Sequence, residues 1–289
     1  MVGFYRKAVV ILLLMLVNSP SAFSRPDMTP LGPSIADQGS SFYRFKTYKV
    51  ESVDTQRHYK IWVAVPKKPA PAQGYPILYL LDGNSSLSRL NESQLQGISE
   101  KNPAVLVFVG YDTPLPFDLK ARSFDYTPAA RGATEGNSML GRGRVGGGSA
   151  IFRALLEQKI IPQSEASLPI DQAKRSLWGH SFGGLFVLDT YLHSSRFSHY
   201  FAASPSLGQG FQFLVDDIQA QKVNPATLTL MVGSSQSARA GAQPAIDLSP
   251  RVEQWQKQGL GISIVHYPGL SHGAMFGASL QDTLNDVSQ

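Results

Sequence analysis

Hydrophobic and polar positions follow different periods along this chain, and these periods predict where its strands and helices lie. Polar and apolar residues alternate over residues 43–53 and 59–65, which predicts two antiparallel strands joined by the polar residues 54–57. A strand that is buried on both faces of a parallel sheet instead shows a continuous apolar run. Four such runs are residues 77–81, 104–109, 200–203 and 228–232, and residues 262–265 form the last predicted strand.

Helical spacing separates several of these strands. Apolar residues recur on one face of residues 149–161, with Pro162 just past the end, and residues 252–258 form a second predicted helix that Gly259 closes. Residues 111–148 follow neither period, and so long an irregular segment is usually functional or mobile. The alternation predicts an α/β fold, with one mainly parallel sheet and helices on both faces. In such sheets ligands bind at the carboxyl ends of the strands.

The segment around Ser181 carries the strongest chemical signal. Residues 175–178 form a short strand, residues 179–183 read Gly-His-Ser-Phe-Gly, and apolar residues at helical spacing follow. This order of strand, tight turn and helix is that of a nucleophile elbow, in which a Cβ at the glycines would collide with a neighbouring strand or helix. We therefore predict that Ser181 is a catalytic nucleophile; a purely structural turn is the alternative.

A serine hydroxyl needs a base within hydrogen-bond reach. His272 lies 91 residues after Ser181, on the loop after the last predicted strand, which matches the α/β-hydrolase order of nucleophile first and histidine last. His272 is therefore the predicted base, and a surface histidine is the alternative. His180, inside the elbow, is expected to point away from Ser181 and to serve packing. Surface or core positions are expected for His58, His193, His199 and His266.

The acid that usually completes a catalytic triad is missing from its usual place. It would lie on the loop after residues 228–232, where a carboxylate orients the imidazole and stabilises its charged form. Residues 233–246 contain neither Asp nor Glu, and Asp247 is the first acid. Asp247 could reach back to the site, but its position favours capping the helix that follows. We therefore expect a dyad of Ser181 and His272, with a backbone carbonyl or a polar side chain positioning the imidazole.

Two backbone N–H groups are predicted to form the oxyanion hole. The first is that of Phe182, at the start of the helix after the nucleophile. The second is that of Asn84, in the turn that follows residues 77–81. Because the donors are backbone N–H groups, the residue types at the two positions give little evidence for or against this role.

Arg122 is the predicted substrate-binding residue. It stands among Phe124, Tyr126 and Pro128, and a guanidinium beside aromatic rings suits a planar, anionic or phenolic ligand. Arg131 lies in the same irregular region. Two further arginines there, Arg142 and Arg144, are expected to be solvated surface charges.

The N-terminal residues have the composition of a targeting segment. Arg6 and Lys7 precede an apolar run over residues 8–17, and residues 22–24 read Ala-Phe-Ser, a small-x-small cleavage site. Residues 1–24 are therefore predicted to be a secretory signal peptide. The alternative is an uncleaved segment that tethers the protein loosely to the inner membrane, although the apolar run is too short to span a bilayer comfortably.

The composition limits the number of domains and the functional classes that are compatible with residues 25–289. The 289 residues are 43% hydrophobic and 16% charged, which fits a single domain over residues 25–289. Loss of Arg6 and Lys7 lowers the formal charge from +5 to +3, and no Lys/Arg-rich run suggests nucleic acid. The chain has no cysteine, which excludes disulfides, thiolate metal sites and a cysteine nucleophile. No metal or cofactor is predicted, and an exported chain without cysteine fits a bacterial periplasm.

Four sequence blocks together resemble a known enzyme family. They are Tyr-Leu-Leu-Asp-Gly-Asn at 79–84, Arg-Ser-Phe-Asp-Tyr-Thr-Pro at 122–128, Trp-Gly-His-Ser-Phe-Gly-Gly at 178–184 and Ala-Ser-Pro-Ser at 203–206. Over nearly all of residues 25–289 the chain resembles the esterase-D-like α/β hydrolases. Within them it is most similar to periplasmic esterases that open the trilactone of catecholate siderophores. The resemblance implies the α/β-hydrolase fold without a lid domain, a Ser-His dyad, and Arg122 as a substrate contact.

The resemblance also implies a small-molecule substrate. This is a macrocyclic tri-serine lactone that bears catechols, of the enterobactin and salmochelin type, cut to linear forms for iron metabolism with or without bound iron. A periplasmic carboxylesterase of broader specificity on the same fold is a second hypothesis. A non-catalytic protein that binds catecholates is a third, and the intact elbow and the position of His272 count against it.

Overall fold

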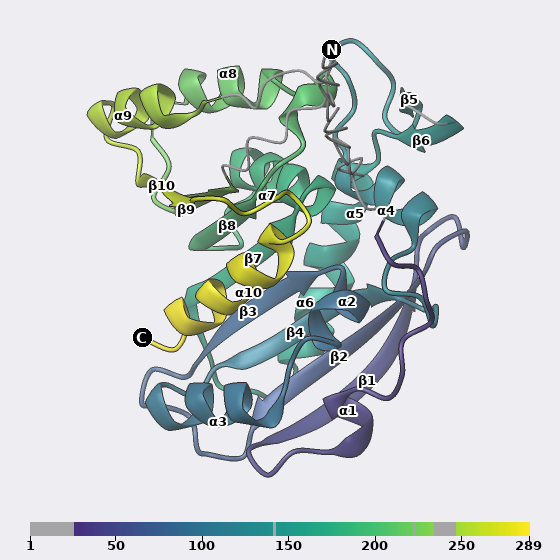
Figure 1. Cartoon of the computed structure of the whole chain (residues 1–289), viewed down its shortest axis with the longest axis vertical. Coiled ribbons are helices and arrows are strands. Elements are labelled where there is room, and N and C mark those ends of the chain that lie inside the picture. The colour runs from purple at the N-terminus through teal and green to yellow at the C-terminus, as the bar shows by residue number, and fades with distance from the viewer. Residues whose placement is uncertain (1–25, 141–142, 222, 234–246) are drawn as a thin grey trace, which may run out of the picture.

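An eight-stranded sheet forms the centre of the molecule (Figure 1). The structure, a computed structural model, describes residues 26–140, 143–221, 223–233 and 247–289. The strand order is β1-β2-β4-β3-β7-β8-β9-β10. The strands are β1 (Tyr43–Glu51), β2 (His58–Pro66), β3 (Tyr75–Leu81), β4 (Val105–Tyr111), β7 (Ile170–His180), β8 (His199–Ala203), β9 (Thr227–Gly233) and β10 (Ile262–Tyr267).

Parallel pairing dominates this sheet. Strand β3 pairs in parallel with β4 and β7, and the pairs from β7 through β8 and β9 to β10 are parallel as well. Only β2 runs antiparallel to its neighbours, β1 and β4. The predicted mainly parallel sheet is confirmed, and the strand predicted at 175–178 is longer than expected because β7 begins at residue 170.

Both faces of the sheet carry a hydrophobic core because side chains alternate along each strand. In β3, Ile77, Tyr79 and Leu81 contribute to one core, whereas Leu78 and Leu80 contribute to the other. The first face is covered by α4 (Leu119–Tyr126), α5 (Ser149–Leu155), α6 (Ile161–Glu165), α7 (Phe182–His193), α8 (Phe213–Ala220) and α9 (Ser249–Lys257). The second is covered by α1 (Ile35–Gln38), α2 (Gly83–Leu87), α3 (Glu92–Lys101) and α10 (Met275–Asp286). The predicted α/β fold with helices on both faces is therefore confirmed.

Residues 111–148, predicted to be irregular, contain regular structure. Helix α4 begins after Asp118, whose carboxylate accepts two backbone N–H groups of the first turn at 2.9 and 3.1 Å. A small antiparallel pair follows, formed by β5 (Ser138–Leu140) and β6 (Arg144–Gly146). The prediction was wrong because α4 lacks an apolar stripe: Arg122, Ser123 and Asp125 are among its buried residues.

The helix predicted over residues 149–161 does not stop at Pro162. Helix α5 continues through a π-helical turn, Leu156–Ile160, into α6, and Pro162 lies in the first turn of α6. Proline has no N–H to donate to the preceding turn, and a widened π turn at this point absorbs the missing bond. The chain therefore remains helical to Glu165.

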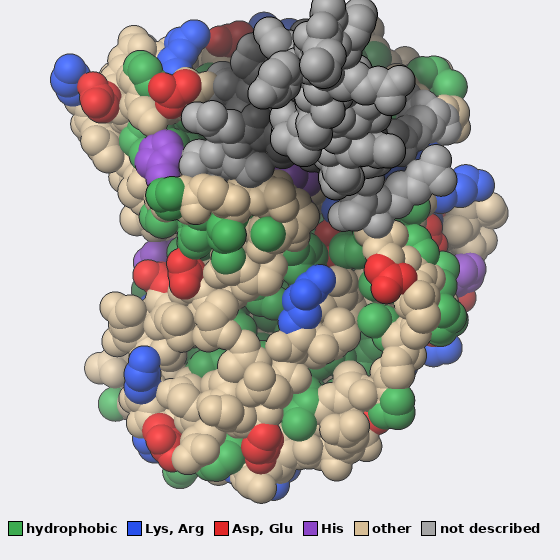
Figure 2. All heavy atoms as spheres, in the orientation of Figure 1, with side chains coloured by type: hydrophobic (Ala, Val, Ile, Leu, Met, Phe, Trp, Pro, Cys, Tyr) green, Lys and Arg blue, Asp and Glu red, His purple; other side chains and the backbone are tan. Residues whose placement is uncertain are grey.

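The predicted signal segment, residues 1–24, lies outside the described residues. Among the helices that the structure describes, none is long and apolar enough to cross a bilayer. On the face seen in Figure 2, the described basic and acidic side chains are scattered singly or in small groups.

Candidate active site

A strained turn places Ser181 between β7 and α7. Its φ of 63° and ψ of −114° are rare for a residue with a side chain and are expected at a nucleophile elbow. A Cβ at Gly179 would lie 2.5 Å from the carbonyl oxygen of Gly183, and one at Gly184 would lie 2.9 Å from that of Ala203. These glycines therefore allow α7 and the end of β8 to approach the turn closely, as the motif predicts.

His272 lies on the loop between β10 and α10, at the carboxyl ends of the parallel strands. Its Nε2 is 3.0 Å from the Oγ of Ser181. The surrounding protein lowers the pKa of His272 below its ordinary value by desolvating the charged form, and the positive charge of Arg122 lowers it further. A neutral imidazole can accept the hydroxyl proton near neutral pH. The structure thus brings the two predicted residues into the geometry of nucleophile and base.

No carboxylate is hydrogen bonded to His272 within the part of the chain that the structure describes. Asp247 instead lies just before α9, where its Oδ1 accepts the N–H of Ser249 at 2.9 Å. This bond lowers the pKa of Asp247. Asp247 therefore lies near the start of α9 as expected, but the N-cap residue is Leu248, so the expected capping role is wrong. Residues 234–246 lie outside the described residues.

The two predicted oxyanion donors lie at the starts of two helices that follow neighbouring strands. Phe182 is the first residue of α7 and Asn84 is in the first turn of α2, where N–H groups have no partner within the helix. Leu80 of β3 pairs with Trp178 of β7, so the turns that follow the two strands lie side by side. The Asn84 side chain accepts the N–H of Tyr111 at 2.8 Å and thereby fixes α2 to the end of β4. The oxyanion role itself stays a prediction.

Arg122 lies on α4, with its guanidinium buried beside the elbow. Its Nε and Nη2 each donate to the carboxylate of Asp82 at 2.8 Å, which forms a bidentate ion pair. The guanidinium carbon is 5.5 Å from the ring centre of Tyr126 and 5.7 Å from that of Phe182. The predicted substrate contact remains a prediction, and Nη1, which has no hydrogen-bond partner among the described residues, is the donor available for it.

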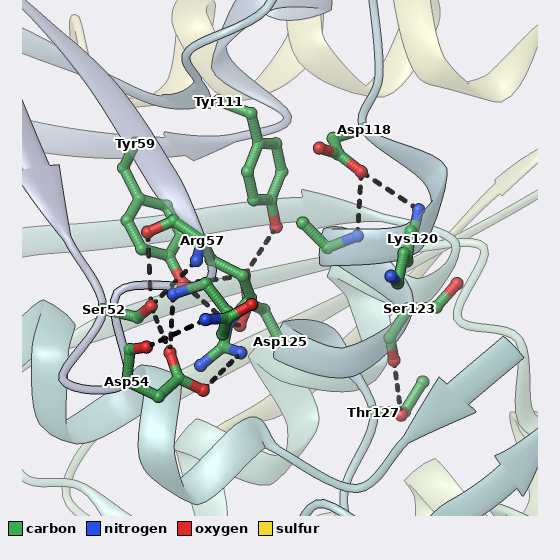
Figure 3. A network of polar contacts seen from close by, with 12 residues as sticks. Ser52, Asp54, Arg57, Tyr59, Tyr111, Asp118, Lys120, Ser123, Asp125 and Thr127 are labelled. Atoms are coloured by element: carbon green, nitrogen blue, oxygen red, sulfur yellow. Dashed lines mark hydrogen bonds and ion pairs between the residues drawn. The ribbon is translucent and has the colours of Figure 1, made fainter.

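A second polar network also holds α4 in place (Figure 3). The Oδ2 of Asp125 accepts the hydroxyl groups of Tyr59 and Tyr111, each at 3.0 Å, and its Oδ1 is 3.0 Å from the Nε of Arg57. These contacts join α4 to β2, to β4 and to the turn before β2. Arg122 is therefore presented to the site from a helix that is fixed at two points.

Arg144, expected to be a solvated surface charge, lies close to the elbow instead. Its guanidinium carbon is 5.4 Å from the ring centre of Phe182, and its Nη1 donates to the Oγ of Ser123 at 3.3 Å. The β5–β6 pair folds back over α4 and brings Arg144 there, which residue spacing alone did not reveal. The ring of Phe182 is therefore close to the guanidinium groups of both Arg122 and Arg144. Arg142 lies outside the described residues.

Ser206 is a site residue to which sequence reasoning assigned no role. Its Oγ is 3.0 Å from the Oγ of Ser181, and its N–H donates to the Ser181 carbonyl at 3.3 Å. Ser206 follows β8, the strand beside β7 in the sheet. The block Ala-Ser-Pro-Ser at the carboxyl end of that strand was the signal that could have identified it.

His180 makes a specific polar contact in addition to packing. Its side chain is buried, and its Nε2 is 2.8 Å from the carbonyl oxygen of His272. Burial lowers the pKa of His180 to about 3, so the imidazole is neutral. The other four histidines have partners elsewhere: His58 with Glu51, His193 with Asp189, His199 with Ser198 and His266 with Ser249.

Comparison with known proteins agrees with this geometry. The family model described as "Putative esterase" matches residues 52–287. The chain belongs to this esterase family. This esterase is 45% identical to the apo-salmochelin esterase of Escherichia coli O6:H1 over 95% of its own length and 89% of the relative. It is 30% identical to the ferri-bacillibactin esterase BesA of Bacillus subtilis, over 77% of this chain and 82% of the relative.

Solved structures support the fold of this esterase. The enterobactin hydrolase IroE in complex with DFP matches with a TM-score of 0.78 and 45% identity, covering 89% of this chain and 99% of that one. A second structure, the enterobactin and salmochelin hydrolase IroE, matches with a TM-score of 0.77 at 44% identity over the same shares. The fold of this esterase is therefore the α/β-hydrolase fold of these enzymes.

Proposed function

We propose that this esterase hydrolyses the trilactone ester bonds of catecholate siderophores of the enterobactin and salmochelin type, with Ser181 as nucleophile and His272 as base. The observation that carries the proposal is the 3.0 Å contact between Ser181 Oγ and His272 Nε2 at the strained turn. That contact lies in a chain 45% identical to an apo-salmochelin esterase over 95% of its length. The contact between Ser181 and His272 supports the proposed ester hydrolysis, and the similarity to the apo-salmochelin esterase supports the proposed substrate.

Ester cleavage at this site proceeds through an acyl-enzyme. Ser181 Oγ attacks the ester carbonyl while His272 Nε2 takes its proton, and the N–H groups of Phe182 and Asn84 stabilise the oxyanion. As the C–O bond breaks, His272 gives this proton to the leaving serine alkoxide oxygen of the substrate, which becomes a hydroxyl. Water attacks the acyl-enzyme as His272 takes its proton, and return of that proton to Ser181 Oγ releases the linear product.

Positive charge and aromatic rings beside the elbow support a catecholate substrate. The guanidinium carbons of Arg122 and Arg144 lie 5.7 and 5.4 Å from the ring centre of Phe182. Guanidinium groups bind planar oxygen ligands and stack on aromatic rings. The named substrates of the two relatives are an apo-siderophore and a ferric one, so the proposal includes both iron-free and iron-bound forms.

One assay tests both the reaction and the substrate. Purified wild type and Ser181→Ala are incubated separately with enterobactin and with short acyl esters, and the products are followed by mass spectrometry. Opening of the trilactone by the wild type, lost in Ser181→Ala, is the expected result. Turnover of short esters with an intact trilactone would instead identify a carboxylesterase of broader specificity. Binding of enterobactin without turnover in the wild type would identify a non-catalytic catecholate-binding protein.

The dyad part of the proposal has its own test in Asp247. Because its carboxylate accepts the N–H of Ser249 beside α9 and makes no bond to His272 in the described part of the chain, Asp247→Asn is expected to leave kcat within a few-fold of wild type. Loss of a true triad acid costs about 10⁴-fold in kcat. A loss of that size in steady-state kinetics, with an unchanged thermal transition, would show that Asp247 is the missing acid.

We further propose export to the periplasm, with residues 1–24 removed. The basic start, the apolar run over residues 8–17 and the small-x-small site support this. Cell fractionation and intact-mass measurement are expected to find a periplasmic chain that begins at residue 25. An uncleaved chain in the inner-membrane fraction would contradict cleavage and support the loose tether.

A further inference from the structure

The residue before the nucleophile is tied to the residue that supplies the base. His180 ends β7, and its Nε2 is 2.8 Å from the carbonyl oxygen of His272. A carbonyl oxygen only accepts hydrogen bonds, so Nε2 of His180 must carry the proton and donate it. Ser181 and His272 are therefore connected twice: directly between Oγ and Nε2, and through the side chain of His180.

The His180 ring is held firmly in this position. It lies on the face of the sheet that α10 covers, with its centre 5.4 Å from that of Phe276 and 4.8 Å from that of His272. Phe276 also packs edge-on against Trp178, two residues earlier in β7, at 5.2 Å. Because burial keeps the imidazole uncharged, it has a single N–H, and the bond to the His272 carbonyl fixes that N–H at Nε2.

Within the described residues 270–275, the other backbone hydrogen bonds of the segment that carries His272 are local to it. The N–H of Leu270 bonds to the carbonyl of Tyr267, and that of Met275 to the carbonyl of Ser271. In a serine triad a carboxylate holds the imidazole through Nδ1, but no described carboxylate does so for His272. The bond from His180 instead acts on the backbone of His272.

We propose that His180 is a positioning residue: its bond to the His272 carbonyl sets the loop so that Nε2 of His272 faces Ser181 Oγ. His180 acts through His272 and makes no contact with the reacting oxygen. The inference rests on the proposed chemistry of Ser181 and His272. Displacement of a base by about 1 Å can cost about 100-fold in rate, so the bond governs kcat.

A matched pair of variants separates this role from packing. His180→Gln and His180→Met introduce unbranched side chains of similar length, but only glutamine has an N–H that reaches the position of Nε2. We expect His180→Met to lower kcat by about 10- to 100-fold with KM changed by less than about threefold. His180→Gln is expected to keep kcat within about threefold of wild type. Equal losses in the two variants, or a change confined to KM, would overturn the proposal.

A second measurement does not require the siderophore: the rate at which a fluorophosphonate labels Ser181 is compared between wild type and the two variants. A wild type that is not labelled at Ser181 contradicts the proposed catalytic site. A labelled wild type with His180→Met labelled just as fast leaves that site intact and overturns the positioning role. If neither variant folds, nitrogen-15 NMR of histidine-labelled wild type decides: a neutral His180 with its proton on Nε2 supports the proposal, and a proton on Nδ1 refutes it.

Discussion

The hydroxyl oxygen of Ser181 has two close partners, the Nε2 of His272 and the Oγ of Ser206, each at 3.0 Å. When Ser181 directs its own proton to His272, its Oγ accepts the proton of Ser206, and this contact keeps the Ser181 side chain in the rotamer that faces His272. We predict that Ser206→Ala lowers the rate of Ser181 acylation by about 2- to 10-fold, the effect of one hydrogen bond. Stopped-flow measurement of the acylation burst checks this.

Ser206→Thr is the control because it keeps the hydroxyl group. It is expected to retain more of the acylation rate than Ser206→Ala. An acylation rate in Ser206→Ala equal to that of wild type would mean that the contact with Ser181 plays no part in the reaction.

The positive charge of Arg122 predicts a pH effect. Desolvation by the surrounding protein lowers the pKa of His272, and Arg122 lowers it further. The proposed base must be neutral to act, so activity is expected to persist to lower pH than an ordinary histidine allows. Removing the guanidinium raises the pKa of His272. The acid limb of the kcat/KM profile is therefore expected to move to higher pH in Arg122→Gln combined with Asp82→Asn. The double variant avoids leaving the Asp82 carboxylate buried without its partner, which would cost about 3–5 kcal/mol.

Arg89→Gln is the matched control for this shift. The guanidinium of Arg89 lies over the ring of Phe276 at 5.0 Å and lowers the pKa of His180, but it has no resolved effect on that of His272. Its acid limb is expected to coincide with that of wild type. If the acid limb of the kcat/KM profile does not move in the double variant, desolvation alone sets the pKa of His272.

At the residue scale, the placement of side chains that depends on chain order was predictable, and the contacts between segments distant in the sequence were not. Ser181 and His272 are each marked by a motif and by a position after a strand. The partners of Ser206 and His180 depend on which strands and loops become neighbours, and no local pattern encodes that. Such contacts require the strand order, which the sequence pattern does not determine.

Among the elements, the start of α7 shows how closely the elbow is packed. A Cβ at Gly184 would lie 2.9 Å from the carbonyl oxygen of Ala203 and 3.1 Å from the Cα of Pro205. Backbone atoms cannot move aside without shifting β8, so Gly184→Ala is expected to destabilise the fold by about 1–3 kcal/mol, the usual cost of overpacking. Urea unfolding followed by circular dichroism measures this cost.

Gly183 is the control within the same turn of α7. The nearest atoms to a Cβ there belong to Leu81 at 3.6 Å, which is an ordinary contact distance. Gly183→Ala is therefore expected to leave the unfolding free energy unchanged or to raise it, since alanine favours a helix over glycine. Equal unfolding free energies for Gly184→Ala and wild type would contradict the packing argument.

Strands were predictable from apolar runs, whereas α4 and the π-helical turn at Leu156–Ile160 were not. Helix α4 is held by the ion pair of Arg122 with Asp82 and by the contacts of Asp125, so its buried face is polar and has no hydrophobic period. The capping residue Asp118 was the one local signal for it. A helix whose buried side chains form ion pairs cannot be predicted from the period of its hydrophobic residues.

Across the whole molecule, the network around Asp125 joins strands β2 and β4 to α4, the helix that carries Arg122. Burial raises the pKa of Asp125 to about 7, against 3.8 for an ordinary aspartate. Between these values the folded protein binds a proton that the unfolded chain releases, so this group makes the free energy of unfolding fall as pH rises from about 4 to about 7. Its contribution continues to fall through pH 7 and is constant above about pH 8.

Asp125→Asn should remove this pH dependence. The amide can still accept the tyrosine hydroxyl groups through its oxygen but does not titrate. The stability of wild type relative to Asp125→Asn is therefore expected to decrease from pH 5 through pH 7 in urea unfolding, and to level off above about pH 8. Asp54→Asn is the control from the same network, because hydrogen bonds lower the pKa of Asp54 and take its titration below this range. A stability difference for Asp125→Asn that is constant or increases from pH 5 to pH 7 would mean that Arg57 and the two tyrosines keep the Asp125 carboxylate ionised throughout.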